Sequence, residues 1–391
     1  MEEWKIYKLG DLYKVHNGLS KGGNFFGSGF PFLSFKIVFN NYFLPHTLSD
    51  LVQTSEKERC NFDIKRGDVF ITRTSETAEE LGMSCVALKD YPNATYNGFT
   101  KRLRPINDIV VPEYIGYYLR SPKFRDLFYG LASSMSTRAS LANSDLLNMP
   151  VSIPSYSAQI KIASILQSLD DKIEVNRRIN DNLEQQGQAL FKSWFVDFEP
   201  FKDQPFVESE LGMIPQGWRV YCLSEFLPVV TGKKDANVAK GGQYPFFSCS
   251  QDFGWTDDYS FEGNAILVAG NGDFNVKMYN GKFEAYQRTY VLIPYNPQYT
   301  AWLFYAVKYH LNDITSAARG SVIKFITKGN LADFKFSAPS SLENATIIEK
   351  FDFIKKIIAL NELESRRLAE LRDTLLPRLM SGELSVNDIK E

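Results

Sequence analysis

An internal repeat constrains this chain more than any other feature. Residues 4–9 (WKIYKL) match residues 218–223 (WRVYCL), and residues 30–34 (FPFLS) match residues 244–248 (YPFFS), both at an offset of 214. Two matches that share one offset are hard to obtain by chance, and an overlooked repeat would mis-assign the whole fold. The sequence therefore predicts one design that is used twice.

The offset falls along the repeat, so the second copy has lost residues. The later matches are residues 67–71 with 263–267 at an offset of 196, Pro105 with Pro294 at 189, and residues 112–114 with 297–299 at 185. The fall from 214 to 185 corresponds to 29 missing residues. The offset of 185 then holds up to Pro154 and Pro339, so each copy ends at the same proline.

Each copy is followed by a segment with the hydrophobic spacing of a long helix. Positions that alternate in steps of four and three from residue 162 are mostly apolar, as in the seam of a coiled coil, and the pattern recurs 185 residues later. The predicted seam residues are Ile162, Leu166, Leu169, Ile173, Asn176, Leu183, Leu190, Trp194, Ile347, Phe351, Ile354, Ile358, Asn361, Leu368, Leu375 and Leu379. About 40 residues at 1.5 Å each give a helix on the order of 60 Å long, which suits a spacer.

Asn176 and Asn361 interrupt the two seams at equivalent positions. A buried Asn in a seam costs stability but fixes the register and the partner, which predicts a polar contact between these two residues. The alternative is an Asn at the wet edge of an ordinary amphipathic helix. The spacing alone does not separate these interpretations.

The two copies themselves are predicted to be β-rich. Apolar runs at residues 69–71, 86–88 and 265–268 are bounded by Gly, Asp and Asn, as strands are, and helical stretches are expected near residues 114–127 and 299–311. The predicted fold class is α+β, with two pseudo-symmetric β-rich domains joined by two long antiparallel coiled-coil helices. The predicted segments are residues 1–155 for the first domain, 156–200 for the central helix, 201–217 for a linker, 211–340 for the second domain and 341–386 for the C-terminal helix. Antiparallel helices would set the two domains apart, as the reading of two separated half-sites requires.

The charge of the chain is nearly balanced, with 44 Lys and Arg against 46 Asp and Glu. This balance excludes a protein that coats nucleic acid or an anionic membrane without selectivity. By segment, residues 1–155 and 211–340 each carry +2, whereas residues 156–210 and 341–391 carry −4 and −2. Contacts to nucleic acid are therefore expected to be local to the two globular copies.

Candidate DNA contacts are basic and hydroxyl residues in loops rich in Gly, Ser and Thr, because these side chains suit phosphates and base edges. They are Lys21, Arg73, Thr74, Ser75, Ser136, Arg138, Lys233, Lys234, Arg319, Ser321 and Lys324. For any one of them, an ordinary solvated surface residue is the competing interpretation.

No motif predicts catalysis or a metal site. Residues 296–299 (NPQY) approach the Asn-Pro-Pro-Tyr motif of amino-methyltransferases, but the third residue is Gln and no glycine-rich turn for S-adenosylmethionine precedes them, so a structural turn is expected. The chain has no GxxxxGK[ST] phosphate loop, and its three histidines, His16, His46 and His310, are not spaced as metal ligands. No run of about 18 apolar residues predicts a membrane span. The acidic start, Met1-Glu2-Glu3, is unlike a signal peptide, which predicts a cytoplasmic protein.

Several segments carry a family resemblance that covers essentially the whole chain. They are the first helix at residues 158–183, ALFKSWFVDFEP at 189–200, SELGMIPQGW at 209–218 and LLPRLMSGEL at 375–384. GDVFITRTSET at 67–77 and RGSVIKFITKGNL at 319–331 look like segments of target recognition domains. With these segments the chain resembles the specificity subunit of Type I restriction-modification systems.

The resemblance implies a division of labour. Each β-rich copy would be a target recognition domain that reads one half of a bipartite double-stranded DNA target, and the helices would set the spacer and dock two methyltransferase subunits. This chain would have no activity alone and no cofactor of its own. The methyltransferase subunits would bind S-adenosylmethionine and methylate adenine, and restriction subunits, where present, would use ATP and Mg.

Two other hypotheses compete with this one. An enzyme in its own right would need a nucleotide or S-adenosylmethionine motif, which the sequence lacks. A coiled-coil scaffold without sequence-specific DNA binding would leave the two diverged β-rich copies unexplained.

Overall fold

The computed structural model describes residues 4–73, 81–132, 141–316, 324–342 and 346–386. The chain divides into two compact units. Unit 1 comprises residues 1–174 and 365–391, and unit 2 comprises residues 175–364. Two long helices, α7 (Tyr156–Phe191) and α11 (Thr346–Ser381), each contribute a part to both units.

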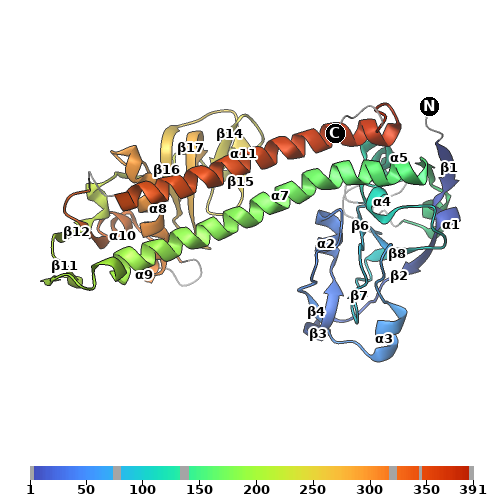
Figure 1. Ribbon diagram of the computed structural model, residues 1–391, viewed down its shortest axis with the longest axis horizontal. Helices are drawn as coiled ribbons and strands as arrows, with labels where there is room; N and C mark the ends of the chain where they lie inside the picture. The colour runs from blue at the N-terminus through green and yellow to red at the C-terminus, as the bar shows by residue number, and fades with distance from the viewer. Residues whose placement is uncertain (1–3, 74–80, 133–140, 317–323, 343–345, 387–391) are drawn as a thin grey trace. The chain divides into compact units, whose positions relative to one another are not determined.

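Unit 1 combines three small sheets with short helices (Figure 1). Its strands are β1 (Lys5–Lys8), β2 (Tyr13–Asn17), β3 (Phe26–Leu33), β4 (Leu51–Val52), β5 (Val69–Thr72), β6 (Ser84–Val86), β7 (Thr95–Tyr96), β8 (Thr100–Pro105) and β9 (Pro150–Ile153). Its other helices are α1 (Leu9–Leu12), η1 (Gly23–Phe25), α2 (Phe35–Asn40), α3 (Glu56–Asn61), α4 (Pro112–Tyr118), α5 (Pro122–Ala132) and α6 (Asn143–Asn148). The strand orders are β2-β8-β5-β6, β4-β3-β7 and β1-β9, and the β3–β7 pair is parallel.

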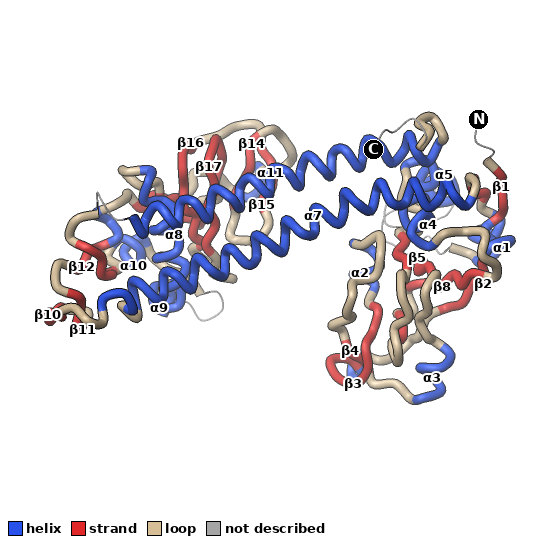
Figure 2. Tube along the Cα trace, in the orientation of Figure 1, coloured by secondary structure: helices blue, strands red, loops and turns tan. Residues whose placement is uncertain are grey.

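Unit 2 gathers most of its strands into one six-stranded sheet (Figure 2). The strands are β10 (Phe206–Ser209), β11 (Gly212–Pro215), β12 (Trp218–Cys222), β13 (Val229–Thr231), β14 (Tyr244–Phe247), β15 (Phe253–Thr256), β16 (Phe261–Ala269), β17 (Val276–Ala285), β18 (Thr289–Leu292) and β19 (Lys335–Pro339). The helices are η3 (Lys192–Val196), η4 (Glu199–Phe201), η5 (Leu223–Glu225), η6 (Ala236–Val238), η7 (Pro297–Tyr299), α8 (Thr300–Tyr309), α9 (Leu311–Ser316) and α10 (Lys328–Ala332). The order of the large sheet is β13-β18-β16-β17-β14-β15.

The repeat predicted from the sequence is confirmed in the strand pairing. The β2-β8-β5-β6 order of unit 1 recurs as β13-β18-β16-β17 in unit 2, and the β1–β9 pair recurs as β12–β19. Lys5 lies opposite Ile153, and Arg219 lies opposite Ala338, at offsets of 214 and 185. The predicted fold, two β-rich copies joined by two long helices, is thus the observed one.

One step of the repeat alignment was wrong by a residue. Val69 of β5 lies opposite Leu103, whereas Ile266 of β16 lies opposite Leu292. Val69 therefore corresponds to Ile266 at an offset of 197, not to Ala265 at 196. A slip of one residue moves a strand's side chains to the other face of the sheet, and sequence similarity in short apolar runs does not detect it.

Capping residues stand at the start of α7 and at the end of α11. The side-chain oxygen of Ser155 accepts a hydrogen bond from the N–H of Ala158 (3.3 Å) at the start of α7. The helix continues as the π-helix η3 to Val196. Helix α11 runs through Pro377 and ends before Gly382, whose φ of 77° is typical of a C-terminal cap.

The first expected short helix is interrupted. Residues 114–127 belong to two helices, α4 and α5, because Pro122 starts a new helix after a turn closed by the hydroxyl of Ser121, which donates to the carbonyl of Tyr118 (2.7 Å). In unit 2 the corresponding stretch is α8, followed directly by α9.

The long helices form part of the core in both units. In unit 1, Ile162 and Leu166 of α7 and Leu379 of α11 are buried with the residues of the main sheet and of α4. In unit 2, Phe191 at the end of α7 and Phe351 of α11 are buried with the residues of α8. Because each core combines strands with parts of both helices, neither copy is packed independently of the helices.

Candidate nucleic-acid interface

Several loops of unit 1 meet at one end of its four-stranded sheet, β2-β8-β5-β6. The N–H of Leu19, after β2, donates to the carbonyl oxygen of Tyr96 (2.9 Å). The N–H of Arg73, after β5, donates to the carbonyl oxygen of Phe99 (3.0 Å), and the N–H of Leu141 donates to that of Arg73 (3.1 Å). These five residues define what we call the loop frame, in which backbone bonds hold four separate chain segments together.

Unit 2 contains the same loop frame. The N–H of Lys233 donates to the carbonyl oxygen of Ala285 (3.1 Å), that of Gly270 to Arg288 (2.8 Å), and that of Ile326 to Gly270 (3.0 Å). Each of these residues corresponds to one in unit 1 through the offsets 214, 197, 189 and 185. The repeat therefore preserves the loop geometry as well as the strands.

A glycine in each frame makes this close approach possible. A Cβ on Gly18 would lie 2.0 Å from the carbonyl oxygen of Asn97, and a Cβ on Gly232 would lie 2.1 Å from that of Tyr286. The two glycines are equivalent at an offset of 214, and so are the two contacts. A side chain at either position would force backbone segments apart.

The side chains carried by the two frames differ. Phe99, which is 60% exposed, corresponds to the exposed Arg288. Leu19 is buried, whereas its counterpart Lys233 is exposed. Arg offers hydrogen bonds to guanine edges and Phe offers apolar contact to a thymine methyl, so the two frames present different chemistry on the same backbone.

Lys21, a predicted DNA contact, already has an acidic partner. Its ammonium group lies 2.9 Å from Glu58 and 4.8 Å from the ring centroid of Phe25. The hydrogen bond from the backbone of Ser55, followed by the bond from Lys21, lowers the pKa of Glu58 to about 2. Contact between Lys21 and a phosphate would therefore require this ion pair to open.

The other predicted DNA contacts that the structure describes lie in or beside the loop frames. Arg73 and Lys233 belong to the frames, and the carbonyl of the neighbouring Lys234 accepts the N–H of Gln287 (2.9 Å). Lys324 is exposed, and its carbonyl accepts the N–H of Gly272 (3.1 Å). Thr74, Ser75, Ser136, Arg138, Arg319 and Ser321 lie outside the described residues.

Two cations near the frame of unit 2 were missed by sequence reasoning. Arg288 lies between β17 and β18, and Lys277 of β17 donates to the carbonyl oxygens of Ser248 (3.3 Å) and Ser250. Burial lowers the pKa of Lys277. The signal for Arg288 was available, because it aligns with Phe99 once the repeat offset of 189 is applied.

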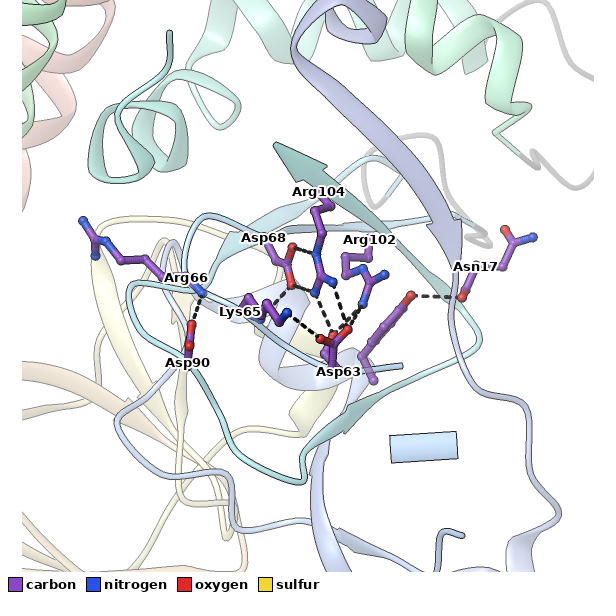
Figure 3. A network of polar contacts seen from close by, with 9 residues as sticks. Asn17, Asp63, Lys65, Arg66, Asp68, Asp90, Arg102 and Arg104 are labelled. Carbon is purple, nitrogen blue, oxygen red and sulfur yellow. Dashed lines mark hydrogen bonds and ion pairs between the residues drawn. The ribbon is translucent and has the colours of Figure 1, made fainter. Parts of the chain in front are cut away.

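Arg102 and Arg104 of the basic strand β8 pair with acidic residues of unit 1 (Figure 3). Arg104 donates two hydrogen bonds to the fully buried Asp68 (2.8 and 2.7 Å) and pairs with Asp63 (3.0 Å). Arg102 is also buried and pairs with Asp63 (2.9 Å). Lys101 donates to the side chain of Asn143, and burial lowers its pKa. These cations stabilise the fold, so they do not belong to the candidate interface.

The predicted seam faces inward along both helices. Ile162, Leu166, Asn176, Ile347, Phe351, Ile358 and Leu379 are buried, and Leu169, Ile173, Leu183, Leu190, Trp194, Ile354, Asn361, Leu368, Leu375 are half-buried. Near the end of α7 the most buried residues are one position later, at Phe191 and Phe195, and near the end of α11 their counterparts Leu376 and Met380 are buried together with the seam residue Leu379. A straight helix drifts from a seven-residue repeat in this direction.

Asn176 and Asn361 do meet, as part of a larger polar network inside unit 2. The amide of Asn176 donates to Glu364 (2.7 Å) and to the backbone carbonyl of Asn361 (3.5 Å). The amide of Asn361 donates to the side-chain oxygen of Asn180 (2.8 Å), whose amide donates to the carbonyl of Ile358 (3.2 Å). Asn176 is 1% exposed, so it does not lie at a wet edge.

An acid on α7 and a cation on α11 join the helices in each unit. In unit 2, Glu184 accepts from Lys308 of α8 (2.6 Å), Tyr305 of α8 (3.1 Å) and Lys355 of α11 (3.3 Å). In unit 1, Asp170 accepts from Arg372 of α11 (2.6 Å). Because α7 supplies the acid in both units, these charges favour α7 beside α11 over α7 beside another α7.

The apparent catalytic fragment at residues 296–299 forms a turn. The side-chain oxygen of Asn296 accepts the N–H of Gln298 (3.1 Å) and caps η7. Among the described residues, no group of three or more His, Cys, Asp or Glu is placed to hold a metal ion. Within the same residues, no helix combines the length and the apolar character that a membrane span needs.

Comparison with known proteins agrees with this arrangement. The family model of the Type I restriction modification DNA specificity domain matches the chain twice, at residues 1–185 and 215–373. The MjaIX specificity subunit of Methanocaldococcus jannaschii, a Type I restriction enzyme, is 26% identical over 99% of this chain and 95% of its own length. The EcoDI specificity subunit of Escherichia coli is 36% identical over 179 residues, which are 44% of this chain and 40% of that subunit.

A solved structure shows the same fold. The S subunit of the Type I restriction-modification system from M. genitalium superposes with a TM-score of 0.55 at 17% identity, over 97% of this chain and 96% of that one. The two matches of the family model coincide with the two copies of the repeat, including the start of each long helix. The chain therefore belongs to the family of Type I restriction-modification DNA specificity subunits.

Proposed function

We propose that each unit of this chain reads one half of a bipartite double-stranded DNA target through its loop frame. In this proposal α7 and α11 set the spacing between the half-sites and dock two methyltransferase subunits. The observation that carries the proposal is the loop frame itself, which has the same backbone hydrogen bonds in both units and different exposed side chains. Such a pair of frames suits two half-sites of different sequence.

The charge distribution supports a model in which this chain recognises bases and its partners contact most of the phosphates. The frames offer a few exposed cations, such as Lys233 and Arg288, while Arg102 and Arg104 of β8 are tied to Asp63 and Asp68. Affinity for DNA depends mainly on the number of phosphates that a protein neutralises. This chain therefore supplies base selection, and its partners supply much of the contact to phosphates.

The spacing function follows from helix geometry. Helix α7 contains 36 residues, as does α11, and 36 residues extend about 54 Å at 1.5 Å each. Ion pairs and the Asn176 network connect the two helices, which favours a paired and stiff spacer over a flexible one. A stiff spacer selects half-sites at one separation.

In this proposal the chemistry belongs to the partners. Two methyltransferase subunits bind S-adenosylmethionine and methylate adenine, and restriction subunits, where present, use ATP and Mg. This chain has no catalytic step and no cofactor of its own, and it works in the cytoplasm, on the DNA of the cell. The names of its relatives, which are specificity subunits of Type I restriction enzymes, support this assignment.

Methylome sequencing tests the proposal. A methylation-deficient host that expresses this chain with its methyltransferase partner should gain modified adenines in one motif, made of two short sequences and a fixed unspecified spacer. A host that expresses the methyltransferase alone is the control. Modification without a sequence motif would instead support a scaffold without sequence-specific DNA binding.

A further inference from the structure

A tight turn with the same closing hydrogen bond forms part of each loop frame. In unit 1 the turn leads into β8, and the N–H of Thr100 donates to the carbonyl oxygen of Asn97 (3.0 Å). In unit 2 the turn leads into β18, and the N–H of Thr289 donates to the carbonyl oxygen of Tyr286 (2.7 Å). Both pairs of residues are related by the offset of 189, so the repeat preserves the turn.

The third residue of each turn lies next to a buried anchor and is itself exposed. The last residues of the turns, Thr100 and Thr289, are 0% and 1% exposed, and the hydroxyl of Thr100 donates a second bond to the carbonyl oxygen of Asn97 (2.7 Å). The third residue is Phe99 in unit 1, which is 60% exposed, and Arg288 in unit 2, which is also exposed. These two side chains therefore project from the same place on equivalent backbones.

The backbone of both third residues is tied to neighbouring loops. The carbonyl oxygen of Phe99 accepts the N–H of Arg73 (3.0 Å), and that of Arg288 accepts the N–H of Gly270 (2.8 Å). The thiol of Cys249 is a second donor to the carbonyl oxygen of Arg288 (3.4 Å). A side chain on a fixed backbone loses little further freedom when it binds, and this pre-organisation suits a residue that selects a base.

The guanidinium of Arg288 is available for a ligand. No acidic side chain pairs with it among the described residues, whereas Arg177 and Arg219 of the same unit pair with Asp181 (2.6 Å) and Glu225 (3.0 Å). A guanidinium carries five N–H donors in a planar fork, and this fork matches the O6 and N7 acceptors that guanine presents in the major groove. The position therefore suits the reading of a guanine in the half-site of unit 2.

Phe99 offers a different contact from the same position. Its side chain has no hydrogen-bonding group, and because the ring is 60% exposed it keeps much of its apolar surface in water. In the major groove only thymine presents a methyl group, which apolar side chains such as Phe contact. The position therefore suits a thymine in the half-site of unit 1.

We propose that the third residue of this turn is a base-reading position in both units, where Arg288 reads a guanine in the half-site of unit 2 and Phe99 contacts the methyl group of a thymine in the half-site of unit 1. The inference rests on the proposed function and names the bases that this position selects. Because the duplicated backbone carries a different side chain in each unit, the two half-sites differ in sequence at this position.

Base analogues in the cognate duplex test the proposal. The complex of the full chain with its methyltransferase partner is bound to duplexes in which one base at a time is replaced, by 7-deazaguanine, which lacks the N7 acceptor of guanine, or by uracil, which lacks the methyl group of thymine. In the half-site of unit 2, one 7-deazaguanine should weaken binding by about tenfold, and Arg288→Ala should abolish that sensitivity. In the half-site of unit 1, one uracil should weaken binding about threefold to fivefold, and Phe99→Ala should abolish that sensitivity. Replacement of residues 1–155 identifies the half-site of unit 1.

The matched controls are Arg219→Ala, at an exposed ion pair of unit 2, and Ile106→Ala, at an exposed residue beyond the other end of β8, and both should keep the two sensitivities. If Arg288→Ala or Phe99→Ala stays as sensitive to the analogues as the unaltered chain, the turn is not a base-reading position in both units and the proposal is wrong, while the proposed function stands. The proposal is also wrong if no guanine in the half-site of unit 2 responds to its analogue. Equal binding of cognate and scrambled duplexes by the unaltered complex would contradict the proposed function itself, and the base-reading position with it.

Discussion

The carboxylate of Asp170 on α7 lies 2.6 Å from the guanidinium of Arg372 on α11. Its second oxygen accepts a hydrogen bond from the hydroxyl of Tyr117 on α4 (2.6 Å). One carboxylate thus joins both long helices to the β-rich part of unit 1. In unit 2 Glu184 has the same role with Tyr305 and Lys355, so in each unit a shared acid joins the long helices to a shorter helix.

Asp170→Asn should destabilise the chain. The side chains of Asp170 and Arg372 are 26% and 18% exposed, so loss of the pair leaves the partly buried Arg372 with only the exposed Asp373 as an acidic partner, at a cost of about 1–2 kcal/mol. Asp171→Asn is the matched control, since Asp171 is exposed and should change the free energy of unfolding by less than about 0.5 kcal/mol. Urea unfolding measures both values, and equal effects would rule out the role given to Asp170.

Unit 2 should lose stability in acid through Glu184. Burial alone would raise the pKa of Glu184, but Lys355 and Lys308 outweigh burial and hold the pKa below its ordinary value of 4.5. A carboxylate with a lowered pKa stabilises the folded state above the unfolded pKa, and this contribution is lost as pH falls through the folded pKa. Glu184→Gln should therefore be less stable than the unaltered chain at pH 7, and the difference should shrink below about pH 5. A difference in urea midpoint that stays constant down to pH 3 would contradict this account.

Substitution of the glycine in each loop frame should impair the recognition of one half-site only. Gly18→Ala should disturb reading by unit 1 and Gly232→Ala reading by unit 2, because the added Cβ would meet a backbone oxygen about 2 Å away. Gly23→Ala, where no atom lies within 4 Å of the added Cβ, is the control. Binding of the methyltransferase complex to duplexes with either half-site scrambled measures the effect. If Gly18→Ala alters the preference at both half-sites, the units do not read independently.

Substitution of Arg288 in the loop frame of unit 2 should lower the affinity for DNA, whereas substitution of Arg104 inside unit 1 should lower the stability of the fold. Arg288→Ala should weaken binding to the cognate duplex by about 10- to 100-fold, the value of one good base contact, with little change in stability. Arg104→Met should cost about 3 kcal/mol of stability, because it leaves the buried Asp68 without its cation. Arg219→Ala and Arg66→Met, at exposed ion pairs, are the respective controls. A similar effect of Arg288→Ala on cognate and scrambled DNA would exclude base reading.

Sequence patterns predicted the architecture well because repetition and helical spacing depend on many residues at once. The alignment of Val69 failed by one position, because a short apolar strand matches nearly as well in either register and only the pairing with Leu103 decides it. The polar network around Asn176 also exceeded the expected pair, since the seam pattern does not show where Asn180 and Glu364 point.

The candidate interface was less predictable than the fold. The sequence does not show which acidic residue a Lys or Arg pairs with. Lys21 was therefore predicted to contact DNA, although it pairs with Glu58. Arg288 was overlooked because its loop has no Gly, Ser or Thr pattern of the kind used to select candidates. The repeat offset of 189 aligns it with Phe99, and the backbone hydrogen bonds show that the two residues hold equivalent places in the two loop frames.

The most direct test of the central claim replaces residues 1–155 with the corresponding segment of another family member and sequences the methylome of a host that also carries the methyltransferase subunit. Independent frames on a fixed spacer predict that one half of the motif changes, while the other half and the separation between them stay the same. A change in both halves, or a change in the spacer, would contradict the account.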